Sequence, residues 1–258
     1  MATAVALTIA AAITTYAWQN GSIATEPPIT PDQSAEEAAR IAGFDDRDKA
    51  AIEAIVRDYI MQHPEILPEA MQALRQRQTA AQIKDLHEQI VTPYAKAFAG
   101  NPDGDVVLAE YSDFACGFCR ASVADVNKLL KEDPNLKVVF HELPILSDES
   151  GTAAEWAMAA AEQGKYIAFH DAMFAAGRPS SATIQQAATK AGLDMDAARK
   201  FVASDAGEKT INQNIEIARQ LSFSGTPSWV IGNQVLSGAV GYDALKKAIA
   251  EARKGDDS

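Results

Sequence analysis

The chain has only two cysteines, Cys116 and Cys119, and they stand three positions apart in the sequence Cys-Gly-Phe-Cys. Two cysteines placed at random in a chain of this length would have this spacing about one time in a hundred. A disulfide that closes so short a loop removes little entropy from the unfolded chain, and 258 residues can bury a sizeable core without it. The spacing therefore indicates chemistry at the two sulfur atoms rather than stabilisation.

The residues that flank the cysteines predict a strand before them and a helix after them. A turn at 101–104 is followed by the apolar run 106–111, which is typical of a buried strand. Apolar residues recur at helical spacing over 121–131, and 136–143 predicts a second strand. Two strands with a helix between them form a βαβ unit, so the cysteines lie where its first strand gives way to its helix.

The rest of the chain after this unit predicts an α/β fold with a helical insertion. Residues from about 150 to 220 are rich in alanine and other helix formers, with glycines between the helical stretches. The chain then passes through Gly225-Thr226-Pro227 into a β-hairpin over 228–236 and a closing helix over 242–253.

The first 44 residues contain two segments that do not belong to the predicted α/β fold. Residues 2–18 form an uncharged, mostly apolar run, so we predict a signal peptide or a membrane anchor over 1–20. Residues 21–44 are polar and contain several prolines, as a linker does. A buried N-terminal helix of a cytosolic protein is the alternative.

Residues 45–95 predict two helices. The first ends at His63-Pro64, and the second begins near Pro68 and continues without a break to Ile90. The apolar positions at helical spacing are Ile52, Ile55, Val56, Tyr59, Ile60, Met71, Leu74, Ile83, Leu86 and Ile90. Such helices have to bury their apolar stripes, either against another protomer or against their own domain. We predict an oligomerisation segment.

The charge of the chain excludes one class of partner. Its 35 acidic and 23 basic residues give a net charge of -12. A negative surface repels phosphate backbones, so nucleic acid is not an expected partner.

The position of the cysteines suits disulfide chemistry. A thiol in the first turn of a helix faces unpaired backbone N–H groups and the positive end of the helix dipole, both of which stabilise the reactive thiolate. Cys116 would attack a disulfide, and Cys119 would resolve the mixed disulfide. The alternatives are a structural disulfide or a zinc or copper site. Zinc would need two more ligands, and the four histidines show no paired spacing near the cysteines, so no metal or cofactor is expected.

Together these motifs resemble the DsbA-like thiol:disulfide oxidoreductases of the thioredoxin superfamily, over roughly residues 95–255. The resemblance implies a thioredoxin-like fold with a helical insertion in a domain over 96–258. Residues 52–60 with the following His63-Pro64-Glu65-Ile66-Leu67 are similar to the N-terminal segment of the ScsC, or copper-sensitivity suppressor, subgroup. In that subgroup some members use the segment to oligomerise.

The resemblance also implies roles for residues away from the cysteines. Thr226 and Pro227 would form the family's cis-proline loop, which lies against the cysteine pair and offers backbone to an extended substrate. Glu110 would be a buried acid that assists proton transfer at Cys119, and a rim carboxylate facing solvent is the alternative. The central dipeptide, Gly117 and Phe118, lacks a histidine, which puts a strongly oxidising potential in doubt. Gly117 and Phe118 are also expected to contact the substrate, and Phe118 suits an apolar contact with an unfolded chain.

The predicted function follows from this resemblance. The protein would form, reduce or isomerise disulfides in exported proteins, in the periplasm or another extracytoplasmic space, free or anchored to the inner membrane by its N-terminus. Its partners would be unfolded or misoxidised exported proteins, a membrane redox partner and further copies of itself, such as in a trimer. The alternative is a copper-binding or chaperone module that uses the cysteine pair and the N-terminal helices.

Four further side chains have structural predictions. Trp156 and Trp229 are expected in the core, and His170 is expected to pack between helices. His141 and Glu142 are expected at the surface.

Overall fold

The computed structural model describes residues 42–255, and the chain divides into two units between Glu69 and Ala70. The predicted signal peptide or anchor and nearly all of the predicted linker lie outside the described residues. Within 42–255, no helix is both long enough and apolar enough to cross a membrane.

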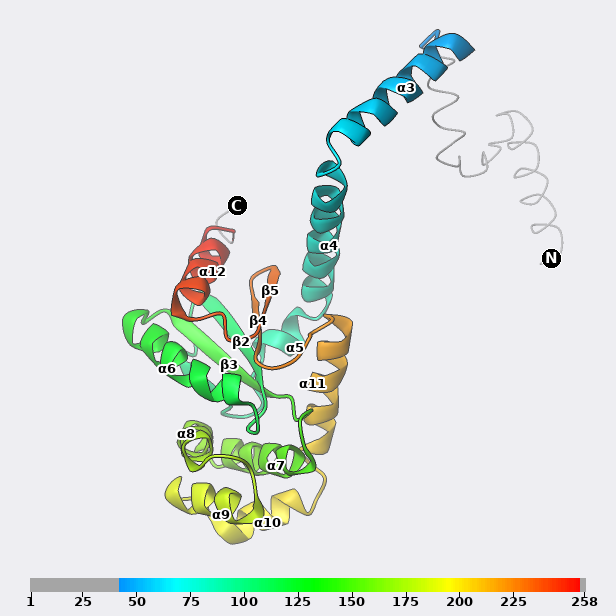
Figure 1. Ribbon diagram of the computed structural model, residues 1–258. Helices are drawn as coiled ribbons and strands as arrows, with labels where there is room; N and C mark the ends of the chain where they lie inside the picture. The colour runs from blue at the N-terminus through cyan, green and yellow to red at the C-terminus, as the bar shows by residue number, and fades with distance from the viewer. Residues whose placement is uncertain (1–41, 256–258) are drawn as a thin grey trace, which may run out of the picture. The chain divides into compact units, whose positions relative to one another are not determined.

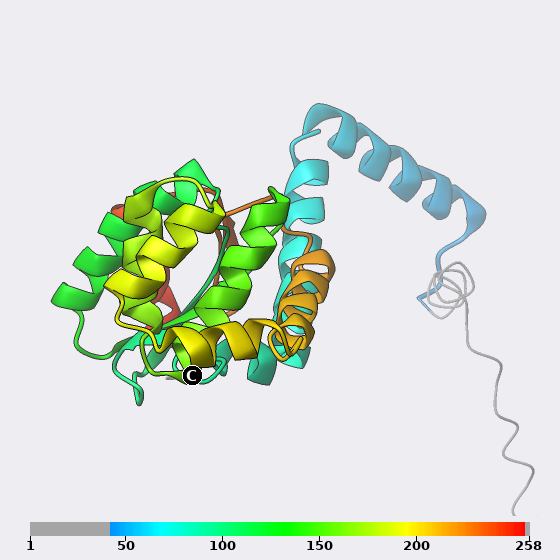
Figure 2. The same cartoon turned by 90° about the horizontal axis from the view of Figure 1, so that it is seen from below.

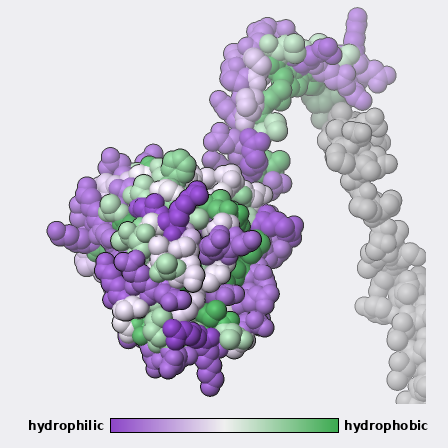
Figure 3. Space-filling view, turned by 60° about the horizontal axis from the view of Figure 1, so that its bottom comes forward, coloured by the Kyte–Doolittle hydropathy of each residue, from purple (hydrophilic) through white to green (hydrophobic). Residues whose placement is uncertain are grey.

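The first unit contains helix α3 (Asp46–Gln62). Asp45 caps it, because its carboxylate accepts the N–H groups of Arg47 and Asp48 while Asp48 accepts the N–H of Asp45 in return. The helix ends at His63, as predicted, and none of its residues is buried. Its hydrophobic residues gather along one side (Figure 3), and the exposed stripe consists of Ile52, Ile55, Val56 and Tyr59.

The prediction of one unbroken helix from Pro68 to Ile90 is wrong. Helix α4 covers Ile66–Asp85, the chain leaves the helical path at Leu86, and a short helix α5 covers His87–Val91. Leu86 and Ile90 are buried with Tyr111 and other residues of the sheet. Packing against the sheet therefore sets the direction of the chain here, over the local helical pattern.

The second unit is built on a five-stranded sheet with the order β1-β3-β2-β4-β5. Its strands are β1 (Phe98–Gly100), β2 (Val106–Ser112), β3 (Leu136–Glu142), β4 (Ser228–Ile231) and β5 (Gln234–Ser237). Strands β2 and β3 are parallel and joined by α6 (Gly117–Glu132), which confirms the predicted βαβ unit and starts its helix four residues earlier than expected. The hairpin β4–β5 is confirmed, and the three-residue edge strand β1 was not predicted because it is too short to show a period.

Helices cover both faces of this sheet (Figure 1). Helices α6 and α12 (Tyr242–Gly255) pack on one face, and α5 and α11 (Glu208–Gln220) pack on the other. Because both faces are covered, β2 and β3 are almost continuously buried. Trp156 and Trp229 are buried, as predicted.

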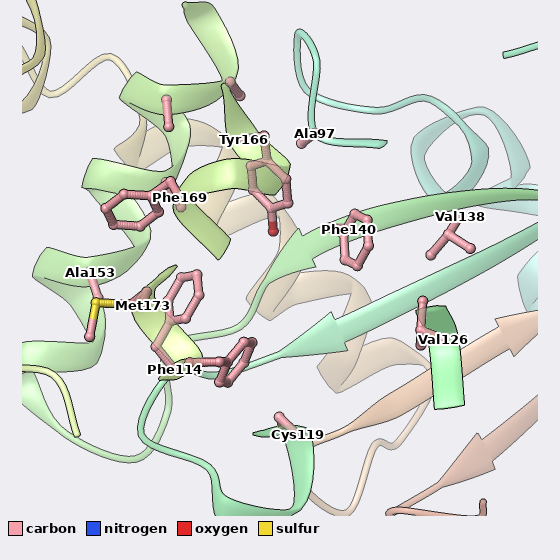
Figure 4. Packing of buried hydrophobic residues seen from close by; sticks show 14 of the residues in the cluster. Ala97, Phe114, Cys119, Val126, Val138, Phe140, Ala153, Tyr166, Phe169 and Met173 are labelled. Atoms are coloured by element: carbon pink, nitrogen blue, oxygen red, sulfur yellow. The ribbon is translucent and has the colours of Figure 1, made fainter. Parts of the chain in front are cut away.

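Four of the helices between β3 and β4 gather at one end of the sheet, as Figure 1 shows and Figure 2 shows from below. They are α7 (Asp148–Glu162), α8 (Tyr166–Ala176), α9 (Ser181–Lys190) and α10 (Met195–Val202), and α11 follows them along the face of the sheet on which it packs. Large apolar side chains fill the space between α8 and the sheet, where Phe114 packs near Phe169 and Tyr166 extends from α8 towards Phe140 (Figure 4). His170 is buried among these aromatic rings, which confirms its predicted place in helix packing.

Candidate active site

The cysteine pair lies at the carboxyl end of β2, where α6 begins. Cys116 is the N-cap of α6, and its sulfur accepts the backbone N–H of Cys119 at 3.3 Å. The sulfur therefore takes the place of the oxygen that usually caps a helix and faces the positive end of the helix dipole. Both cysteines are free, and the exposed fraction is 4% for Cys116 and 0% for Cys119.

The loop before β4 lies against this sulfur. The Cys116 thiol donates a hydrogen bond to the backbone oxygen of Thr226 at 3.2 Å, across 110 positions of sequence. The Thr226–Pro227 peptide bond is cis, as the resemblance implied. Pro227 precedes the first residue of β4, where a missing N–H leaves no strand partner unpaired. The structure thus brings the backbone of Thr226 to Cys116, with Pro227 next to it in the chain.

The two residues between the cysteines face outwards. Gly117 is exposed and a side chain added there would meet nothing within 4 Å. Phe118 is 68% exposed, a large apolar surface for a residue beside a redox pair. The pair is therefore open to a partner on the side of Phe118 and closed on the side of Cys119.

Burial changes the acidity of Cys119. Removal from water raises the pKa of this thiol well above its usual range, and the backbone N–H of Asp113 opposes the shift only in part. The ionised form of Cys119 is therefore unfavourable, and its proton has to be exchanged with a nearby acid or base during disulfide chemistry.

Glu110 is a carboxyl inside the sheet, with an exposed fraction of 2%. It lies in the middle of β2 and pairs with Phe140 on one side and Trp229 on the other. It points to the same face as Leu108, the face that α6 covers, so the alternative of a rim carboxylate in solvent is wrong. Burial raises the pKa of Glu110 to about 8.

The prediction that Glu142 lies at the surface is wrong, because this residue is 1% exposed. The Tyr166 hydroxyl donates to Glu142 Oε1 at 2.7 Å, and Asn214 Nδ2 donates to the Glu142 backbone oxygen at 3.0 Å. Burial raises the pKa of Glu142 to about 8, with the Tyr166 bond lowering it and the charges of Asp113 and Glu110 raising it. The signal that could have found it is its place at the end of a strand buried on both faces.

His141 is also buried, contrary to the prediction. Its Nε2 is 2.8 Å from the backbone oxygen of Ile90 in α5, and its ring stacks on Tyr111 with the centroids 4.5 Å apart. Burial lowers the pKa of His141, which favours the neutral ring. The prediction failed because α5 and α11 cover this face of the sheet, and no pattern near residue 141 shows them.

Asp113 is a site residue that the sequence analysis did not single out. Its carboxylate is buried and accepts the N–H of Ala115 at 2.7 Å and the N–H groups of Ile145 and Leu146 at 2.9 Å each. It therefore ties the loop before Cys116 to the loop after β3. The local signal is an aspartate in the turn after a strand, where its side chain often bonds the backbone two residues on.

Chemically, this arrangement offers two sulfurs, one of them fully buried, and a buried acid. Within residues 42–255, no three or more histidine, cysteine, aspartate or glutamate side chains stand close enough together to hold a metal ion.

Comparison with family models agrees with this geometry. Residues 107–250, more than half of the chain and including every site residue above, match the DSBA-like thioredoxin domain. Residues 48–81 match the copper resistance protein ScsC N-terminal domain.

Solved structures with the same fold cover most of the chain. A thioredoxin-like oxidoreductase from Silicibacter pomeroyi is 36% identical with a TM-score of 0.62, over 65% of this chain and 97% of that one. The thiol-disulfide exchange protein alpha-DsbA2 from Wolbachia pipientis is 28% identical with a TM-score of 0.64, over 69% and 97%. A linker-deletion mutant of Proteus mirabilis ScsC is 25% identical with a TM-score of 0.66, over 81% and 96%.

A curated relative is much longer. The Na(+)/H(+) antiporter NhaA 1 from Salinispora arenicola is 30% identical over 168 residues, which make up 64% of this chain and 26% of that protein. The chain thus spans about a quarter of the length of the first curated relatives it matches. The family match over residues 107–250 and the cysteine pair with its proline loop lead to one conclusion: the chain belongs to the DSBA-like thioredoxin domain family.

Proposed function

We propose that the protein is a thiol–disulfide oxidoreductase that exchanges disulfides with exported proteins through Cys116 and Cys119. The observation that carries the proposal is the Cys116 sulfur, which caps α6 and bonds the Thr226 backbone oxygen next to the buried Cys119. A sulfur in this position is a good nucleophile and a good leaving group.

The proposed oxidation of a substrate dithiol runs in two steps. A substrate thiolate attacks Cys116 of the disulfide form, the bond between the two cysteines breaks, and Cys119 leaves as a thiolate that takes up a proton. A second substrate thiolate then attacks the substrate sulfur of the mixed disulfide, which forms the substrate disulfide and releases Cys116 as a thiolate. Two electrons pass to the cysteine pair, and the reverse sequence reduces a disulfide.

The neighbouring residues have matching roles in this proposal. Glu110 gives the proton to Cys119 and takes it back, because both groups are buried on the same side of the sheet. The backbone of Thr226 and Pro227 receives an extended substrate, and Gly117 and Phe118 form its outer contact. The exposed ring of Phe118 suits unfolded chains, which present apolar side chains.

The proposed setting is the periplasm or another extracytoplasmic space. The uncharged apolar run over residues 2–18 supports export, and the similarity to a protein named for thiol-disulfide exchange supports the proposed chemistry. A membrane redox partner would restore the cysteine pair after each turnover. Oligomerisation through residues 45–95 is proposed from the exposed stripe of α3.

The reduction potential of the cysteine pair tests the proposal. The full chain is equilibrated in glutathione buffers, and free thiols are counted by alkylation. A potential of about -120 to -200 mV is expected for an oxidant or isomerase. A value below about -300 mV would mean a bond too stable to exchange, and the enzyme proposal would be wrong.

The second candidate is a chaperone or copper-binding module, which two observations favour. The apolar stripe of α3 is exposed, and none of the residues of this helix is buried. Residues 48–81 match a domain named for copper resistance. A Cys116→Ser variant separates the candidates. Disulfide exchange should be lost in this variant, whereas the suppression of aggregation by a chaperone should survive.

A further inference from the structure

Two buried carboxyls lie on neighbouring strands of the sheet. Strands β2 and β3 are parallel, and Glu110 pairs with Phe140. Glu142 is two residues beyond Phe140, so its side chain points to the same face as that of Glu110. With strands about 4.8 Å apart and a rise of about 3.3 Å per residue, the Cα atoms of the two glutamates are about 8 Å apart.

Among residues 42–255, no cation contributes to the pKa shifts of these two acids. The charges that act on Glu142 are those of Asp113 and Glu110, and both are negative. The negative charge of Glu110 raises the pKa of Glu142, so the ionisation of one carboxyl is linked to that of the other. The bond from Tyr166 favours the ionised form of Glu142, and it comes from α8 in the inserted helices.

Titratable groups near the two carboxyls come from the β2–α6 loop and from two helices. The groups on the same side are Asp113 in the β2–α6 loop, Cys119 on α6, and Tyr166 and His170 on α8. Tyr111 and His141 point to the opposite face of the sheet, where α11 contributes the uncharged Asn214.

We propose that Glu142, held by Tyr166, is a positioning residue that sets the protonation of Glu110, so that the two carboxyls together manage the proton of Cys119. This inference rests on the proposed disulfide exchange. When Cys119 leaves as a thiolate, the proton moves from the Glu110 carboxyl to the sulfur and the negative charge moves to Glu110. Glu142 stays neutral during this step, because a second negative charge beside Glu110 is costly. The return step moves the proton back from Cys119 to Glu110.

The pH dependence of the reduction potential tests this inference in the full chain. A group contributes to it only if its protonation differs between the disulfide and the dithiol forms, which a merely structural residue does not show. In the wild type we expect two changes of slope from the carboxyl pair, one for each ionisation, in addition to those from the two thiols, which all the variants share. In Glu142→Gln the upper change disappears, and in Tyr166→Phe it moves to higher pH by about one pH unit or less.

The chain offers a matched control at another tyrosine–glutamate pair. The Tyr94 hydroxyl donates to Glu162 Oε1 at 2.6 Å outside the cysteine site, so Tyr94→Phe removes the same kind of bond and should leave the profile as in the wild type. Two changes of slope retained in Glu142→Gln, or no shift in Tyr166→Phe, would overturn the inference while leaving the proposed function intact. A wild-type chain that does not exchange with glutathione would instead overturn the proposed function.

Discussion

Glu110 lies in an apolar layer, where an uncompensated charge lowers the stability of the fold. Its presence there indicates a chemical function. The proposed reason is proton exchange with Cys119, whose thiol is shielded from water. A residue in this role is expected to change the rate of exchange more than the stability of the fold.

Replacing Glu110 by glutamine should slow disulfide exchange near pH 7. Glutamine keeps the shape of the side chain but cannot carry the proton, and a positioned acid or base contributes about 100-fold or more. The rate is measured by stopped-flow reaction of the reduced protein with a model disulfide. Glu162→Gln is the control, because Glu162 is an exposed acid that bonds Tyr94 outside the cysteine site. An unchanged rate in Glu110→Gln would exclude Glu110 from the proposed mechanism.

The two buried acids should also make stability depend on pH. Their pKa values of about 8 in the folded state lie above 4.5, the ordinary value, so the folded chain holds more protons than the unfolded chain between these values. The free energy of unfolding therefore falls as the pH rises from 4.5 to 8, by up to about 1.4 kcal/mol for each unit of pKa shift. Urea unfolding in excess reductant should show a flatter dependence in Glu142→Gln, and an equally steep one would contradict the assignment.

Sequence patterns predicted the cysteine site and most of the sheet, because these depend on neighbours in the chain. The strands flanking α6 show apolar runs, and the capping sulfur follows from the strand-to-helix junction. The burial of Glu142 depends on Tyr166 and Asn214, which come from later helices. The apolar run of β3 could have indicated that Glu142 is buried, but local periodicity holds no information on distant partners, so its bonds to Tyr166 and Asn214 could not be predicted.

Between elements, the carboxylate of Asp113 connects two loops at the active end of the sheet. It accepts three backbone N–H groups, one before Cys116 and two after β3. The loop after β3 presents the exposed side chains of Ile145 and Leu146, so this carboxylate fixes apolar surface beside the cysteine loop.

Asp113→Ala should loosen both loops. At least one shielded N–H would lose its partner, which costs about 1–3 kcal/mol of unfolding free energy. Hydrogen exchange should rise over residues 144–147 and 113–116. Asp194→Ala is the matched control, because Asp194 also accepts two backbone N–H groups but at the start of α10. In the control, exchange should become faster at α10 only. Unchanged exchange around residue 145 in Asp113→Ala would contradict this function of Asp113.

His141 connects α5 to the sheet through the backbone oxygen of Ile90. Burial lowers the pKa of His141 below the ordinary 6.5, so the unfolded chain binds the proton more readily than the folded chain. The contribution of the neutral ring to the free energy of unfolding is therefore lost as the pH falls below 6.5. Hydrogen exchange in α5, corrected for intrinsic rates, should therefore increase more between pH 7 and pH 5 than in His141→Gln, which does not titrate. Equal increases in both proteins would exclude His141 as the cause.

Across the whole molecule, the two units differ in how their apolar residues are used. In the second unit, helices on both faces of the sheet bury a continuous core around Leu108, Phe140 and Trp229. In the first unit, α3 buries none of its residues although four apolar side chains share one side of it. Most of the stability of a helix in a protein comes from the packing of its apolar side, so this stripe is expected to have a partner.

Association between copies of the chain should therefore depend on the α3 stripe. The double variant Ile55→Ser and Tyr59→Ser removes two of its side chains, which are 67% and 56% exposed, and each buried apolar side chain of this size contributes about 1.5–3 kcal/mol. Light scattering should show a larger mass for the wild type than for the double variant at the same concentration. Arg57→Ser changes the opposite side of α3 and should keep the wild-type mass, because residue 57 lies well away from the stripe at helical spacing. A wild-type chain that scatters as a monomer would show that this stripe serves some other contact, and the proposal of oligomerisation through residues 45–95 would be wrong.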